Sequence, residues 1–102
     1  MATLHTVNTS PFERNALDSC LRLAAEGAAV LLFEDAVLGA RAGTRIADKI
    51  KAAMPGLAIY ALGPDLAARG IREDTLIDGI QVVDYPGFVE LTVSHDKVQA
   101  WL

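Results

Sequence analysis

One uninterrupted apolar run constrains the fold more than any other stretch of this sequence. Residues 28–33 read Ala-Ala-Val-Leu-Leu-Phe, and the run stops at two carboxylates, Glu34 and Asp35. A strand that is apolar at every position is covered on both faces, as in the centre of a parallel sheet flanked by helices. The run is too short to cross a membrane. We therefore expect a central strand over residues 28–33, with helices on both faces of the sheet.

The rest of the chain alternates between strand-like and helix-like segments. Strands are expected over residues 2–7, 57–62 and 80–83, and residues 97–102 form either an edge strand or a docked tail. Helical segments are expected over residues 11–26, 36–40, 44–53, 66–69 and 85–94. Such alternation is typical of an α/β sheet with right-handed crossovers. We predict one domain over residues 1–102, a three-layer Rossmann-like α/β fold with a mainly parallel sheet of four to five strands.

Two helix starts carry recognisable capping signals. Ser10 precedes Pro11, and Glu13 follows three residues after Ser10, as in a capping box. The first helix is therefore expected to begin at Pro11, and Gly27 is a natural residue to end it. Thr44 is expected to cap the helix over residues 44–53.

Composition limits the classes of partner. The chain of 102 residues has a hydrophobic fraction of 52% and a formal net charge of −4. A small domain this apolar exposes part of its apolar surface, which predicts an oligomer or a subunit of a complex. No run of Lys or Arg is present, so direct nucleic-acid binding is not expected. The N-terminus lacks the basic and apolar regions of a signal peptide, so we expect a cytoplasmic protein that does not associate with a membrane.

Carboxylates follow several predicted strands and meet at one edge of the predicted sheet. They are Glu34, Asp35, Asp65 and Asp84. Oxygen ligands suit a divalent cation, so one interpretation is an acidic pocket in a stand-alone, receiver-like signalling or binding module. The favoured interpretation is that Asp35, Asp65 and Asp84 each cap the following helix. No phosphate-binding loop is present, and we expect neither a cofactor nor a metal.

Cys20 is the single cysteine and the residue with nucleophilic potential. On a helical wheel it falls inside the apolar arc of the first predicted helix. Such a thiol is either a buried, unreactive packing residue or, if the arc faces a cleft or a partner, a persulfide carrier. His5 lies within the first predicted strand, where a packed or edge position is favoured over a catalytic role. Neither His5 nor His95 has a partner at metal-ligand spacing.

Several segments together resemble the DsrH/TusB family. The resemblance runs through residues 5–12, 31–37, 59–71, 84–95 and 100–102. It covers essentially the whole chain in order, and the C-terminal segment ending in Trp101-Leu102 is its most specific part. The resemblance implies a small cytoplasmic α/β subunit of a sulfur-relay complex.

The resemblance also implies partners and a division of labour. Proteins of this family assemble with DsrE/TusD-like and DsrF/TusC-like paralogues into a heterohexamer that passes persulfide sulfur to a DsrC/TusE-like acceptor. The principal sulfur-carrying cysteine belongs to the DsrE/TusD subunit. DsrH proteins are similar to this chain in having a cysteine in the first helix, whereas TusB proteins often lack it. We therefore predict a DsrH-type subunit in dissimilatory oxidation of stored sulfur, with Cys20 as a candidate secondary carrier. The alternative is a TusB-type subunit serving 2-thiolation of the tRNA wobble uridine.

Overall fold

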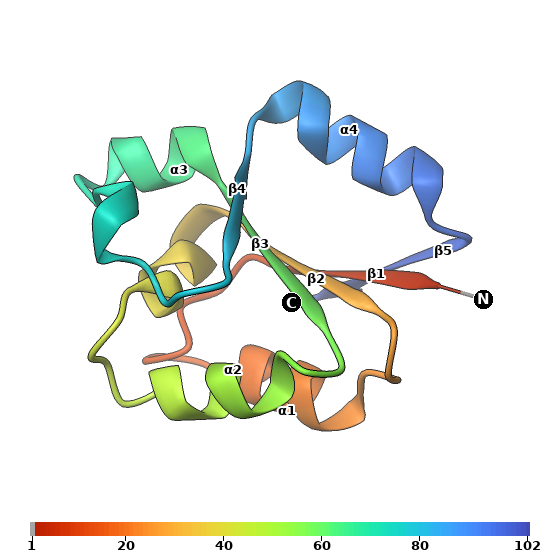
Figure 1. Ribbon diagram of the computed structural model, residues 1–102, viewed down its shortest axis with the longest axis horizontal. Coiled ribbons are helices and arrows are strands. Elements are labelled where there is room, and N and C mark those ends of the chain that lie inside the picture. Colours follow the sequence, from red (N-terminus) through yellow and green to blue (C-terminus); the bar gives the residue numbers. More distant parts are fainter. Residues whose placement is uncertain (1) are drawn as a thin grey trace.

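The computed structural model describes residues 2–102 as an α/β domain built on one five-stranded sheet (Figure 1). The strands are β1 (Thr3–Val7), β2 (Ala29–Leu32), β3 (Ala58–Leu62), β4 (Gln81–Val83) and β5 (Lys97–Trp101). Their order is β4-β3-β2-β1-β5, and every neighbouring pair is parallel. All four residues of β2 are buried. The predicted central strand and the predicted fold class are confirmed.

Helices lie on both faces of the sheet. The helices α1 (Ala16–Leu23) and α2 (Ala47–Ala53) cover one face, and α4 (Tyr85–Ser94) lies on the other (Figure 1). The short helix α3 (Gly63–Ala68) directly follows β3. Two 3-10 segments, η1 (Glu34–Ala40) and η2 (Glu73–Thr75), complete the connections. No helix within residues 2–102 is long and apolar enough to span a bilayer.

The two faces of the sheet bury very different amounts of apolar side chain. Between the sheet and α1 and α2 lies the main core, whose larger fully buried members include Leu17, Val30, Leu32, Ile50 and Ile59. Beneath α4 the fully buried core is limited to Leu4, Ala29 and Leu31. Half-buried side chains of α4, Phe88 and Leu91, pack against those three residues. The α4 face is therefore the thinner layer of the domain.

The first helix is shorter at both ends than the sequence predicts. It begins at Ala16, because Ser10 to Arg14 form a turn in which Ser10 accepts hydrogen bonds from three backbone N–H groups: Phe12 on its hydroxyl, and Glu13 and Arg14 on its carbonyl. Pro11 packs against η1 so closely that a Cβ built on Gly39 would lie 2.8 Å from Pro11 Cγ. The predicted capping box is therefore wrong, since Ser10 organises a turn instead.

The other boundaries differ less from prediction. Helix α2 begins at Ala47, and Thr44 does not cap it with its hydroxyl; instead the Thr44 carbonyl accepts a hydrogen bond from Ala47 N–H in a turn. Helix α1 ends at Leu23, four residues before Gly27, whose φ of +90° turns the chain towards β2. Of the two alternatives for the C-terminal segment, the edge strand is confirmed, because residues 97–101 pair with β1 throughout.

Candidate functional site

Cys20 lies on the side of α1 that faces the sheet. Its exposed fraction is 0%, and it belongs to the main core together with Leu17 and Val30. The predicted place of Cys20 in the apolar arc of its helix is confirmed. Burial in these apolar surroundings raises the pKa of the Cys20 thiol to about 12. Because the thiolate is the nucleophilic form, this thiol is a poor nucleophile at neutral pH.

The geometry of Cys20 sets a condition for sulfur transfer. A persulfide forms only if a sulfur donor reaches the thiol, and no surface of Cys20 is open in this conformation. The two roles considered for Cys20 therefore differ in what they require of the structure. A packing role is compatible with the conformation described here, whereas sulfur loading requires a movement, such as that of α1, that exposes the thiol. That Cys20 carries sulfur stays a prediction.

Two of the carboxylates at the carboxyl edge of the sheet, Asp35 and Asp65, interact with one arginine, and Asp65 also accepts a backbone N–H. Asp65, in the first turn of α3, accepts a hydrogen bond from Glu34 N–H at the start of η1. Arg69 pairs with Asp35 at 2.9 Å and lies 3.9 Å from Asp65. Glu34 itself has a left-handed φ of +49°, which the bond to Asp65 helps to hold. These contacts tie η1 to α3 and engage the carboxylates of Asp35 and Asp65.

Of the three predicted helix caps, only Asp84 acts as one. Its side chain accepts a hydrogen bond from Gly87 N–H at 2.8 Å at the start of α4. Asp35 pairs across to Arg69, and Asp65 binds a neighbouring segment, so the capping prediction is wrong for both. The role of Arg69 was missed, although its position four residues after Asp65 in a helical segment is a signal for an ion pair. Among residues 2–102, no group of three or more His, Cys, Asp or Glu side chains is arranged to hold a metal ion.

His5 and Trp101 connect the first and last strands. The Trp101 indole N–H donates a hydrogen bond to His5 Nδ1 at 3.0 Å, and the two residues are 96 positions apart in the sequence. This bond places the proton of the neutral imidazole on Nε2. His5 is only 6% exposed, and burial lowers its pKa. The packed position expected for His5 is confirmed, and its indole partner was not foreseen.

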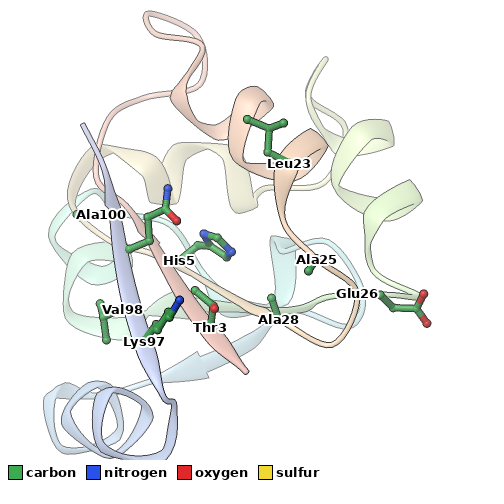
Figure 2. Close-up of a pocket in the computed structure, with 10 residues that line it drawn as sticks. Thr3, His5, Leu23, Ala25, Glu26, Ala28, Lys97, Val98 and Ala100 are labelled. Carbon is green, nitrogen blue, oxygen red and sulfur yellow. The ribbon is translucent and has the colours of Figure 1, made fainter. Parts of the chain in front are cut away.

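A groove of about 730 Å³ lies beside this pair, at the sheet edge formed by β1 and β5. Figure 2 shows Thr3, His5 and Lys97 near one another in the groove, while Glu26 points away from it. Leu23 and Ala28 line its other side. The groove is on the same face of the sheet as α1, but Cys20 does not line it.

The fold and these contacts define a small α/β protein with a parallel sheet, a buried thiol and a thinly covered second face. Comparisons with known proteins identify its family. The family model described as DsrH like protein matches residues 9–98. The chain is 39% identical to Protein TusB of Pectobacterium parmentieri and 40% identical to Protein TusB of Shigella flexneri, in each case over 96% of this chain and 99% of the relative.

Two solved structures share the fold of this chain. The crystal structure of the YchN protein of Escherichia coli matches with a TM-score of 0.84 at 21% identity, covering 99% of this chain and all of that one. A protein of unknown function from Methanobacterium thermoautotrophicum matches with a TM-score of 0.73 at 16% identity, over 96% of this chain and 97% of that one. The chain belongs to the DsrH/TusB family. The receiver-like module suggested by the acidic residues is therefore not supported.

Proposed function

We propose that this chain is a TusB-type subunit of a sulfur-relay complex that serves 2-thiolation of the tRNA wobble uridine. The observation that carries the proposal is the sequence identity of 39% to TusB proteins over nearly the full length of both chains. The same similarity favours this role over the oxidation of stored sulfur that was predicted from the cysteine in the first helix. The formal net charge of −4 is compatible with the proposal, because sulfur in the relay passes between proteins and another enzyme contacts the tRNA.

The subunit acts in this proposal as an architectural member of the complex. Its partners are DsrE/TusD-like and DsrF/TusC-like paralogues in a heterohexamer and a DsrC/TusE-like acceptor, all in the cytoplasm. The full burial of Cys20 supports a division of labour in which the persulfide is carried by a cysteine of another subunit. The apolar side chains exposed on α4 support a role in assembly.

The second candidate is a DsrH-type subunit in dissimilatory sulfur oxidation. The observation in its favour is a cysteine within α1, a feature that resembles the DsrH branch. The two candidates share fold, partners and chemistry, and they differ in the process that receives the sulfur.

Deletion of the gene in its own host separates the candidates. Loss of 2-thiouridine from tRNA, restored by a plasmid copy, is the result expected for the TusB-type role. Unchanged 2-thiouridine with impaired oxidation of stored sulfur would replace the first candidate by the second. Unchanged tRNA and unchanged sulfur oxidation would overturn both.

A further inference from the structure

Helix α4 carries a stripe of exposed apolar side chains on the side that faces away from the sheet. Of its ten residues only Glu90 is charged, and none is fully buried. Phe88 and Leu91 point to the sheet, where they pack against its small core. Tyr85, Val89 and Val93 recur every four residues on the outside and are 58%, 61% and 79% exposed. Side chains at this spacing form one stripe along a helix, and exposed apolar side chains that lie together on a surface mark a site of contact with a partner.

The stripe continues onto the neighbouring edge of the sheet. Val98 of β5 pairs in register with Leu4, so it lies on the face of the sheet that α4 covers, and it is 49% exposed. Figure 1 shows α4 leading directly into β5 at that edge. Tyr85, Val89, Val93 and Val98 together are called the α4–β5 surface. Apart from Leu23 and the terminal Leu102, they are all the exposed large apolar side chains within residues 2–102.

The charges on this surface discriminate between occupants. A helix that lies on a membrane carries lysine and arginine along its polar face, and α4 has neither. A second copy would bring its own Glu90 towards this one wherever two α4 helices met about a twofold axis, and each chain has a net charge of −4. Both features favour a different protein chain that brings apolar side chains and a positive charge.

We propose that the α4–β5 surface docks a non-identical protein subunit, which covers Val89 and Val93 with apolar side chains and places a lysine or arginine beside Glu90. The inference rests on the proposed function, because it takes the chain to be one subunit of a heteromeric complex. It adds to that function which surface makes the contact and what chemistry the partner presents. The partner is a paralogous subunit of the relay.

The test is co-purification of the full chain with its DsrE/TusD-like and DsrF/TusC-like paralogues, with affinity measured on the purified components. The double variant Val89→Lys, Val93→Lys places two charges in the contact. A few central side chains normally contribute most of the binding energy of such an interface. The affinity for the paralogues is therefore expected to fall at least about tenfold. Leu23→Lys is the matched control, because Leu23 is 70% exposed and lies on α1, on the opposite face. Both variants change exposed side chains, so circular dichroism is expected to show unchanged folding.

The outcomes separate this inference from the proposed function. If the wild-type chain and the double variant assemble equally well with the paralogues, the inference is overturned and the proposed function stands. A wild-type chain that binds neither paralogue would overturn the function and the inference with it. A dimer of the isolated chain that the double variant dissociates would assign the surface to a second copy and overturn the inference.

The partner's positive charge is tested separately with Glu90→Gln, which removes charge and keeps shape. Association of the wild type is expected to weaken as salt rises, and Glu90→Gln is expected to reduce that dependence. If Glu90→Gln leaves the salt dependence of association unchanged, the partner does not place a cation opposite Glu90.

Discussion

The reactivity of Cys20 gives the sharpest prediction, because the burial of the thiol determines how much slower its alkylation should be. Burial raises the pKa of this thiol from an ordinary value of 9.0 to about 12. At pH 7 the thiolate fraction is then lower by on the order of a thousandfold. Closure of the core adds to this, since Cys20 is 0% exposed and a reagent must wait for α1 to open. We therefore expect alkylation at least about a thousandfold slower than for a free thiol.

The assay is the rate of iodoacetamide labelling of the native chain at pH 7, followed by intact mass. The same chain in denaturant supplies the unprotected rate. Because the sequence has a single cysteine, a carbamidomethyl group added to a thiol reports on Cys20. A native rate within about tenfold of the denatured rate would refute the reasoning, because it would require a thiol that is open to solvent.

The same measurement within the assembled complex addresses sulfur transfer. If incubation with a persulfide donor adds one sulfur atom to Cys20 in the complex, assembly opens α1 and this subunit is a carrier. If a paralogue's cysteine is loaded while Cys20 stays unmodified, Cys20 serves packing. Either result assigns a role to a residue that the fold alone places in the core.

Three further predictions concern the contacts that hold the last strand and last helix. Trp101→Phe removes the indole donor to His5 and is expected to lower the free energy of unfolding by about 1 kcal/mol, measured by urea denaturation; an unchanged midpoint would show that the bond contributes nothing. Because burial lowers the pKa of folded His5, the unfolded chain takes up a proton first as pH falls, so stability should decline from about pH 6.5 downwards. His5→Asn, whose side-chain oxygen can still accept from Trp101, should lose that His5-linked part of the decline, and an equally steep decline would contradict the assignment. Asp84→Ala removes the α4 cap and should cost about 1 kcal/mol, while Asp84→Asn should cost less; equal losses for the two would argue against a capping role.

The sequence by itself determined the features that depend on short-range patterns. An apolar run at residues 28–33 required a strand buried on both faces, and β2 is that strand. Alternation of strand-like and helix-like segments was sufficient for the α/β class. The wheel position of Cys20 predicted which side of α1 it occupies. Asp84 capping of α4 is equally local, since the acceptor and its N–H donor lie three residues apart.

Tertiary structure alone decided the pairs that are far apart in the chain. The sheet order places β5 beside β1, and only that neighbour relation brings Trp101 to His5. Asp65 would cap its own helix by local rules, but packing of η1 against α3 offers it Glu34 N–H and Arg69 instead. Ser10 likewise forms a turn that brings Pro11 against Gly39, instead of the helix cap that its local sequence predicts. Local sequence specifies which hydrogen bonds a residue can form. It does not specify which of these bonds does form, because the packing of distant segments decides which partners are within reach.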